Sequence, residues 1–316
     1  MTLKEAICFG EENLRVAGVA DHKCDSFILF EHVTGISRAK YYANEHQKIS
    51  KEEQEKYFAL IEKRSQRIPL QHLTGVQEFM GLPFQVSSHV LIPRQDSELL
   101  VETALEILKK ERDKNSQQKA PKPCKETWSI LDMCTGSGCL LISTLFYAKE
   151  ILLNLEGIGV DISLEALENA RRNARLNGLI SSNKAPKDKK ALLTFIQSDL
   201  FEKLSTNKKY KLILSNPPYI PTGEIANLEE EVKNHDPLLA LDGKEDGLYF
   251  YHEIIKQSSN YLEDEGVLIL ECGWDQGVEV SKIMKDHEFA DIELKKDLAG
   301  QNRVVLGKKK KGLKKC

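Results

Sequence analysis

From residue 128 to residue 306, short apolar runs alternate with longer amphipathic stretches, and this alternation constrains the fold more than any other feature of the sequence. The apolar runs have the length of buried strands, and the stretches between them have the period of helices. The expected strands are 128–133, 157–161, 192–197, 211–215, 266–271, 291–295 and 303–306, and the expected helices are 139–149, 164–177, 247–262 and 275–287. Such alternation predicts an α/β fold with a doubly wound, mostly parallel sheet.

A helical region precedes the alternating part. Thr2 with Glu5, and again Ser50 with Glu53, have the spacing of a capping box at the start of a helix. Together with the shorter amphipathic patterns between them, these boxes predict a small bundle of four or five helices over residues 1–72.

Residues 73–94 contain two short β patterns, at 79–86 and 89–92, which predict a hairpin that links the two domains. A helix is expected from Asp96 or Ser97 to about residue 110, and the polar stretches 111–127 and 181–191 predict surface segments. The predicted organisation is a helical domain at 1–72, a β-hairpin linker at 73–94, an α/β domain at 95–307 and a lysine-rich tail at 308–316.

Composition excludes several classes of function. The net charge is −3, so no global charge favours nucleic acid as a direct partner. No stretch approaches the roughly 20 apolar residues of a membrane span. The seven cysteines form no C-x-x-C pair and predict reduced thiols in the cytoplasm, and the eight histidines lack metal-ligand spacing, so no metal site is expected.

The expected strand 211–215 runs directly into Asn216-Pro217-Pro218-Tyr219. Each proline restricts the residue before it, so Asn216 is held on a stiff segment at the carboxyl end of the strand. The Asn216 amide oxygen and the Pro217 carbonyl are acceptors, and Tyr219 offers a flat ring. This set suits a planar –NH2 group and would point its nitrogen lone pair at an electrophile. Because Asn-Pro and Pro-Pro pairs are also common in turns, the tetrapeptide alone leaves both interpretations open.

A second group of residues follows the other expected strands. The glycine pair Gly136 and Gly138 lets backbone approach a ligand at the start of a helix. Asp161 ends the next strand, where an acid commonly accepts the hydroxyls of a ribose, and Asp199 ends the third, where it could bind the amine of an adenine. The candidate cofactor-binding residues are Cys134, Thr135, Gly136, Ser137, Gly138, Asp161, Asp199, Leu200 and Asn216.

The carboxyl ends of adjacent parallel strands meet in one crevice, so these residues predict a nucleoside site. NAD would require a pyrophosphate cradle, whereas a loop with two glycines after Asp132 suits a ligand that has an amino-acid group and no phosphate. S-adenosylmethionine (SAM) fits this description and is itself an electrophile. Strand-end caps are the alternative explanation for the three aspartates.

With these motifs, nearly the whole chain, about residues 1–307, resembles the release factor glutamine methyltransferases (the PrmC or HemK family). The Asn216-Pro217-Pro218-Tyr219 motif is shared with several amine methyltransferases. More specific motifs are Pro69-Leu70-Gln71-His72-Leu73-Thr74-Gly75, Leu82-Pro83-Phe84, Leu91-Ile92-Pro93-Arg94 with Glu98, Asp236-Pro237-Leu238-Leu239-Ala240-Leu241 with Gly243 and Asp246-Gly247-Leu248, Glu271-x-Gly273-x-x-Gln276, and Asp297-Leu298-Ala299-Gly300 with Arg303-Val304-Val305.

The departures from the family pattern are small. Cys134 replaces the usual glycine of the first loop, Gln95 replaces a usual proline, and Asp236 stands where the family generally has glutamate. Leu200 lies where some relatives carry an aromatic residue against adenine, so aliphatic packing is expected there. Cys134 must fit beside the methionine part of the ligand and is expected to be tolerated.

The resemblance implies the seven-stranded SAM-dependent methyltransferase fold and a protein substrate. It implies transfer of a methyl group to the side-chain amide nitrogen of the glutamine in the Gly-Gly-Gln motif of peptide chain release factors. The catalytic residues implied are Asn216, Pro217 and Tyr219, and Pro218 joins them in binding the substrate. Catalysis of this kind rests on orientation and electrostatics rather than on proton abstraction.

Three alternatives remain at the level of sequence. One is glutamine methylation of a ribosomal protein, which the motifs do not exclude. Another is N6-adenine methylation of DNA, which uses a similar loop around a flipped base but is disfavoured by the net charge of −3. A helical adaptor with an inactive methyltransferase fold is disfavoured because the glycine loop and Asn216 are intact. The helical domain is then expected to dock the protein substrate.

Overall fold

The computed structural model describes residues 1–116, 127–152, 154–180 and 191–312. The chain divides into two compact units. The helical unit consists of Met1–Val76 together with Leu228–His235, and the sheet unit consists of Gln77–Asn227 together with Asp236–Cys316. The chain therefore passes between the units three times, because residues 228–235 belong to the helical unit. None of the helices in the described ranges combines the length and hydropathy that a membrane crossing requires.

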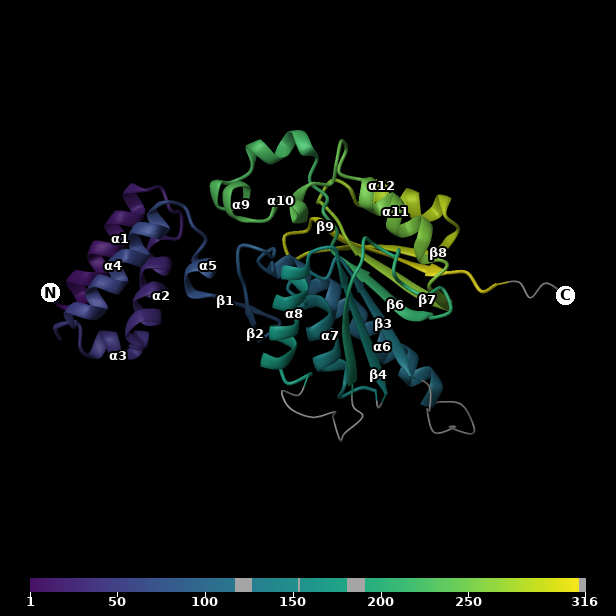
Figure 1. Ribbon diagram of the computed structural model, residues 1–316, viewed down its shortest axis with the longest axis horizontal. Coiled ribbons are helices and arrows are strands. Elements are labelled where there is room, and N and C mark those ends of the chain that lie inside the picture. Colours follow the sequence, from purple (N-terminus) through teal and green to yellow (C-terminus); the bar gives the residue numbers. More distant parts are fainter. Residues whose placement is uncertain (117–126, 153, 181–190, 313–316) are drawn as a thin grey trace. The chain divides into compact units, whose positions relative to one another are not determined.

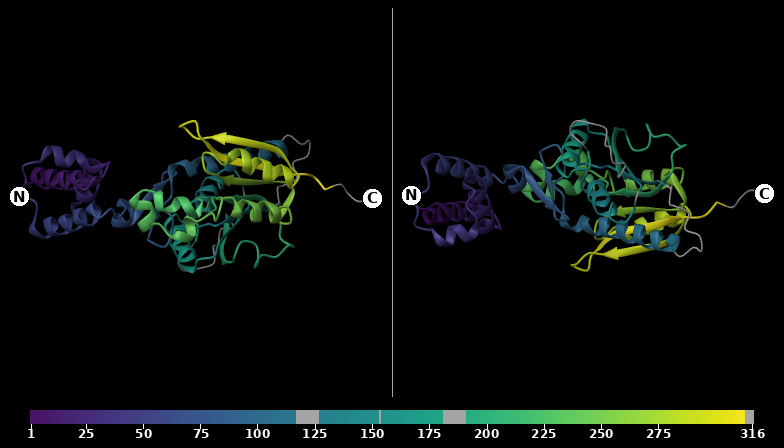
Figure 2. Two further views of the ribbon diagram at one scale, coloured as in Figure 1. Left: turned by 90° about the horizontal axis from the view of Figure 1, so that it is seen from above. Right: turned by 90° about the horizontal axis from the view of Figure 1, so that it is seen from below.

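The helical unit is a bundle of short helices, in which α1, α2 and α4 lie side by side (Figures 1 and 2). Its helices are α1 (Leu3–Val16), α2 (His22–Thr34), α3 (Arg38–Ala43), α4 (Lys51–Ser65), α5 (Leu70–Thr74) and α9 (Glu230–His235). Both predicted capping boxes are confirmed: Thr2 and Glu5 cap α1, and Ser50 and Glu53 cap α4. Each box satisfies two backbone N–H groups that would otherwise lack partners at the helix start.

The core of the bundle is built around Tyr57, whose hydroxyl lies 2.7 Å from Ser26 Oγ. Tyr57 has no solvent exposure, so this hydrogen bond satisfies a polar group that would otherwise be costly to bury. A Cβ added at Gly10 would lie 2.0 Å from the Tyr57 hydroxyl. Gly10 is therefore required for α1 to lie against α4.

Helix α9 is held in the bundle by ion pairs. Glu231 accepts from Arg64 Nη1 at 3.1 Å and from Arg67 Nη2 at 2.7 Å. Arg64 also donates from Nε to Asp25 Oδ2 at 2.7 Å, and Asp25 and Arg64 are both buried. Because buried ionic groups are costly unless each has its partners, this network specifies where α9 lies in the bundle.

The sheet unit contains a seven-stranded sheet in the order β5-β4-β3-β6-β7-β9-β8 (Figure 1). Its strands are β3 (Trp128–Met133), β4 (Leu155–Asp161), β5 (Ala191–Gln197), β6 (Tyr210–Ser215), β7 (Leu262–Glu271), β8 (Phe289–Lys296) and β9 (Asn302–Lys309). Neighbouring strands from β5 to β7 are parallel, and β9 is antiparallel to both β7 and β8. The predicted α/β class and the seven-stranded, mostly parallel sheet are confirmed.

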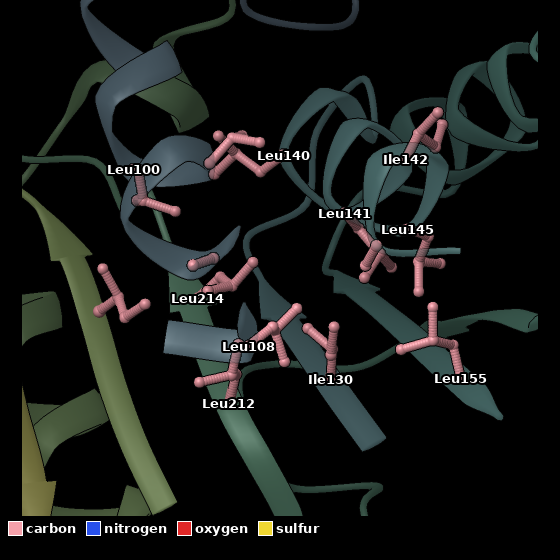
Figure 3. Close-up of a cluster of buried hydrophobic side chains, with 14 of the residues drawn as sticks. Leu100, Leu108, Ile130, Leu140, Leu141, Ile142, Leu145, Leu155, Leu212 and Leu214 are labelled. Carbon is pink, nitrogen blue, oxygen red and sulfur yellow. The ribbon is translucent and has the colours of Figure 1, made fainter. Parts of the chain in front are cut away.

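Helices cover both faces of this sheet. One face packs against α6 (Glu98–Ser116), α7 (Cys139–Ala148) and α8 (Leu164–Leu176), and the other against α11 (Tyr249–Ser258) and α12 (Gly277–Asp286). Figure 3 shows the first of these cores, in which leucines of α6 and α7 meet Ile130 and Leu212 of the sheet. Strands covered on both faces must be apolar throughout, which explains the continuous aliphatic runs in the sequence.

The predicted hairpin is present within residues 73–94, but its strands have other bounds than the sequence predicted. Its strands are β1 (Val76–Phe79) and β2 (Leu82–Gln85), and residues 89–92 form no strand. The turn consists of Met80 and Gly81, both with positive φ (53° and 70°), as a two-residue hairpin turn requires. Pro83 is compatible with β2 because every strand of a two-stranded sheet is an edge.

Other boundaries also differ. Helix α6 continues to Ser116, so the prediction of a loop at 111–127 is wrong for residues 111–116. The last turns of α6 are held by an ion pair, in which Lys211 Nζ lies 3.4 Å from the Glu111 carboxylate. Strand β9 includes Lys308 and Lys309, which were assigned to the tail, because they pair with Ala290 and Phe289 of β8. Most of the predicted insertion at 181–191 lies outside the described residues. The remaining elements are η1 (Gln95–Ser97), η2 (Thr222–Asn227) and α10 (Leu238–Leu241).

Candidate active site

A cavity of about 830 Å³ opens where β3, β4 and β6 end. After β3 the chain adds β4 and β5 on one side of the sheet and then returns to add β6 on the other. This reversal is the position at which doubly wound sheets bind ligands. Four of the five predicted loop residues line the cavity wall, namely Cys134, Thr135, Gly136 and Ser137, whereas Gly138 does not. The other predicted residues in the wall are Asp161, Asp199, Leu200, Asn216 and Pro218.

The loop after β3 has an unusual backbone. Cys134, Gly136 and Gly138 all have positive φ, at 59°, 53° and 81°. A Cβ at Gly136 would meet no atom within 4 Å, so this glycine faces open space, whereas a Cβ at Gly138 would lie 2.8 Å from Ile142 and 3.1 Å from Ala170. Gly138 therefore permits helix packing, and Gly136 permits a ligand to approach the backbone.

The carboxylate of Asp161 supports this loop from the end of β4. Its Oδ2 accepts from the Gly136 N–H at 2.8 Å, and its Oδ1 accepts from the Ser163 N–H at 2.9 Å. Burial raises the pKa of Asp161 above its usual value, while the two backbone hydrogen bonds act to lower it. Each oxygen retains lone pairs for a ligand hydroxyl. Asp199, which ends the neighbouring segment, is exposed on the wall of the cavity.

Asp132 holds the loop through a hydrogen bond to Thr135 and does not line the cavity. It is fully buried and accepts from the Thr135 hydroxyl at 2.6 Å. Burial raises the pKa of Asp132 to about 7. The acid that the sequence placed upstream of the glycines therefore shapes the loop through Thr135.

The motif after β6 divides into two parts. Asn216 and Pro218 line the cavity, whereas Pro217 and Tyr219 are outside its lining. The Tyr219 ring packs against the core beneath α11 and α12, and burial raises the pKa of its hydroxyl. The Asn216 amide nitrogen donates to Ser97 Oγ at 3.3 Å.

The backbone of Tyr219 is fixed by residues from distant motifs. Gln276 Nε2 donates to the Tyr219 carbonyl at 2.8 Å. A Cβ at Gly243 would lie 2.8 Å from the Tyr219 backbone, and one at Gly247, whose φ is +75°, would lie 2.4 Å from the Tyr219 oxygen. These glycines are needed because the chain crosses close behind the motif.

Comparison with known proteins identifies the family. The PrmC N-terminal domain model matches residues 5–75, and the methyltransferase small domain model matches residues 118–233. The release factor glutamine methyltransferase of Clostridium botulinum is 37% identical over 310 residues, covering 98% of this chain and 100% of that protein. The chain belongs to the release factor glutamine methyltransferase family. The release factor glutamine methyltransferase of Agrobacterium fabrum is 36% identical over 304 residues, which cover 96% of this chain and 96% of that protein.

Among solved structures, the release-factor-specific protein-(glutamine-N5) methyltransferase of Alicyclobacillus acidocaldarius aligns with a TM-score of 0.37 and 23% identity, covering 72% of this chain and 99% of that one. The family resemblance drawn from the motifs is confirmed by the sequence relatives. The described residues contain no group of three or more histidine, cysteine, aspartate or glutamate side chains placed to hold a metal ion.

Part of the cavity wall consists of residues that were not predicted from the sequence as site residues. The segment after the hairpin contributes Ser88, Val90 and Arg94 to the wall, and Leu238 and Tyr249 also line it. Arg94 pairs with the buried Asp236 at 2.7 Å, which ties this segment to the one before α10. Of these residues, only Arg94 and Leu238 belong to the family motifs; Ser88, Val90 and Tyr249 carry no local chemistry that marks them in a single sequence.

The structure explains why glycine is usual at position 134 of the family. A side chain in the left-handed region costs about 1–2 kcal/mol, and Cys134 has a φ of 59°. We therefore expect Cys134→Gly to raise the free energy of unfolding by about 1 kcal/mol. The loss of the apolar contacts of the cysteine side chain offsets part of this gain. Urea denaturation would measure this, with SAM affinity as the control. A clear fall in stability would contradict the strain argument.

Proposed function

We propose that this chain uses SAM to methylate the glutamine side chain of the Gly-Gly-Gln motif in peptide chain release factors. Membership of the release factor glutamine methyltransferase family supports this function. The observation that carries it in the structure is Asn216, an amide held at a strand end on the wall of a nucleoside-sized cavity. Such a function takes place where proteins are synthesised, so we also propose a cytoplasmic location.

The residues present fit SAM. The cavity volume of about 830 Å³ lies within the range of small-molecule sites, roughly 300–1,000 Å³. Asp161 and Asp199 would hold the ribose and the adenine amine, Leu200 would pack against the adenine, and the loop at Gly136 would admit the methionine part. When bound, SAM supplies a methyl group on a positively charged sulfur, which keeps the electron pair as the methyl carbon bonds to the substrate nitrogen.

The chain's own contribution is to orient the substrate amide. Asn216 Oδ1 on the cavity wall would accept one hydrogen of the substrate –NH2. The Pro217 carbonyl, which lies between the wall residues Asn216 and Pro218 in the chain, would accept the other, and the ring of Tyr219, packed in the core, would support this segment. Holding two reactants in line can contribute about 7–11 kcal/mol to a barrier. The same acceptors stabilise positive charge that develops on the nitrogen, and one proton then leaves to water.

Exposed apolar side chains at the cavity suit a protein substrate. Leu238, Leu239 and Tyr249 line the cavity and are 62%, 61% and 49% exposed. Apolar side chains that gather at a concave site commonly mark a surface for a partner. We propose that the backbone on either side of the substrate glutamine contacts these three residues.

We propose that the helical unit docks the rest of the protein substrate, because it lies outside the sheet unit that forms the cavity. A chain that begins at Gln77 should bind SAM within about threefold of the full chain and methylate a short Gly-Gly-Gln peptide. It should methylate an intact release factor at least about tenfold less efficiently, a loss of about 1.4 kcal/mol. Calorimetry and initial rates would measure both quantities. Equal rates for intact substrate from both chains would contradict the docking role.

The proposed function is tested by presenting all substrate classes together. The chain is incubated with SAM carrying a labelled methyl group and a cell lysate that contains release factors, ribosomal proteins and DNA. Label is expected in a release factor. Label confined to a ribosomal protein or to DNA would replace this function by one of those alternatives.

A further inference from the structure

A buried carboxylate lies behind Asn216, outside the cavity. Glu271 is the last residue of β7, is 2% exposed and is not among the residues that line the cavity. Its Oε2 has no hydrogen-bond partner among the described residues. Burying an incompletely partnered carboxyl is costly, so its position calls for a compensating role.

Two residues of the cavity wall connect Glu271 to the site. The Asn216 amide nitrogen donates to Ser97 Oγ at 3.3 Å, and Ser97 is 2% exposed. The side chains of Ser97 and Asn216 also lie near enough to the Glu271 carboxyl to act on it, and both lower its pKa. Three side chains from η1, from the end of β6 and from the end of β7 therefore form one connected polar group.

Hydrogen-bond polarity gives this group a direction. An ionised carboxylate can only accept, so the single hydroxyl proton of Ser97 points to Glu271, and the Ser97 oxygen is left to accept from Asn216. The amide nitrogen of Asn216 must then face Ser97 and Glu271. If the amide were turned over, Asn216 Oδ1 would meet the carboxylate, and two acceptors would oppose each other.

We propose that Glu271, together with Ser97, positions the Asn216 amide so that its oxygen is presented to the substrate. This inference rests on the proposed function and goes beyond it, because it assigns a role to a residue that contacts neither substrate nor cofactor. The two faces of an amide differ only in where oxygen and nitrogen lie, so the hydrogen bonds behind it decide which face the substrate meets.

Because Glu271 is buried, the orientation that it imposes on the Asn216 amide depends on pH. Burial raises the pKa of Glu271 to about 7, with Arg303 and the hydrogen bonds of Ser97 and Asn216 acting to lower it and Asp96 to raise it. The other titratable groups that face it are Tyr219, Tyr251, Cys139 and Cys272, whose pKa values are all raised, so they stay neutral near pH 7. A protonated Glu271 can donate to Asn216 Oδ1, and the orientation is then no longer fixed.

Glu271→Gln tests this role, because glutamine keeps the shape but can donate as well as accept. We expect the single-turnover rate with saturating SAM to fall about tenfold at pH 8, with SAM affinity and KM for the substrate within about twofold. The parent rate should rise with pH through about 7, and this rise should be absent in the variant. Glu156→Gln, which removes a carboxylate at the opposite end of β4, is the matched control and should match the parent.

Nuclear magnetic resonance of the parent protein gives a second readout that requires no substrate and no activity measurement. The side-chain amide signal of Asn216, assigned by its loss in Asn216→Asp, should shift with a midpoint near pH 7. An amide signal that does not respond to pH, or a Glu271→Gln rate equal to that of the parent, would overturn the positioning role. Methylation of a different substrate by the parent would overturn the proposed function, while the amide titration would still support the role of Glu271.

Discussion

Replacing Asn216 with alanine is expected to lower the methylation rate by about 10²- to 10³-fold, the range for loss of one preorganised hydrogen-bonding group. Asn216 lines the cavity, and its amide nitrogen is already engaged by Ser97, so its oxygen is the part left for the substrate. The loss should appear in turnover more than in SAM affinity. Single-turnover rates with saturating SAM separate the two.

Asn216→Asp is the matched control for this prediction. It keeps an acceptor oxygen in place, so its rate should lie well above that of the alanine variant. The aspartate would lie beside Glu271, and two neighbouring carboxyls in a buried site share a proton near neutral pH. The Asn216→Asp variant should therefore stay active, because the shared proton leaves only one negative charge on the two carboxyls. If both variants react at the parent rate, residues 216–219 form only a turn.

Asp161→Ala is expected to weaken SAM binding at least tenfold, or about 1.4 kcal/mol. The substitution removes a carboxylate that would accept the ribose hydroxyls, and it also frees the Gly136 N–H, which Asp161 Oδ2 accepts at 2.8 Å. Loss of that bond should loosen the loop that admits the ligand. Titration calorimetry measures the affinity directly.

Asp199→Asn is the comparison for this second prediction. Asp199 is exposed, and solvent screens its interactions, so its loss should cost less than the loss of Asp161. An Asp161→Ala variant that binds SAM as tightly as the parent would remove Asp161 from the site. A larger loss at Asp199 than at Asp161 would reverse the ranking of the two acids.

The sequence predicted the sheet, and the residues at the carboxyl ends of its strands, for a physical reason. Parallel strands covered on both faces are continuous aliphatic runs, and their carboxyl ends meet at one edge. Asp161, Asp199 and Asn216 each follow such a run, so their convergence on the cavity could be inferred without coordinates. The family motifs then supplied the identity of the protein substrate.

Features that depend on long-range packing could not be predicted in this way. Glu231 joins the helical unit through Arg64 and Arg67, far away in sequence, and nothing local to residues 228–235 signals that pairing. The strands of the hairpin were predicted with wrong bounds because its turn places Met80, a residue without turn preference, at a positive φ. The role of Glu271 depends on its burial behind Asn216, which a single sequence does not reveal.

We propose that this chain methylates the side-chain nitrogen of one glutamine in a protein. Tandem mass spectrometry of a purified release factor, after incubation with the chain and SAM, tests it most directly. We expect one added methyl group on the glutamine of the Gly-Gly-Gln motif, and markedly less when Asn216→Ala replaces the parent chain. A methyl group on any other residue, or none on the release factor under conditions where SAM binds, would contradict the claim.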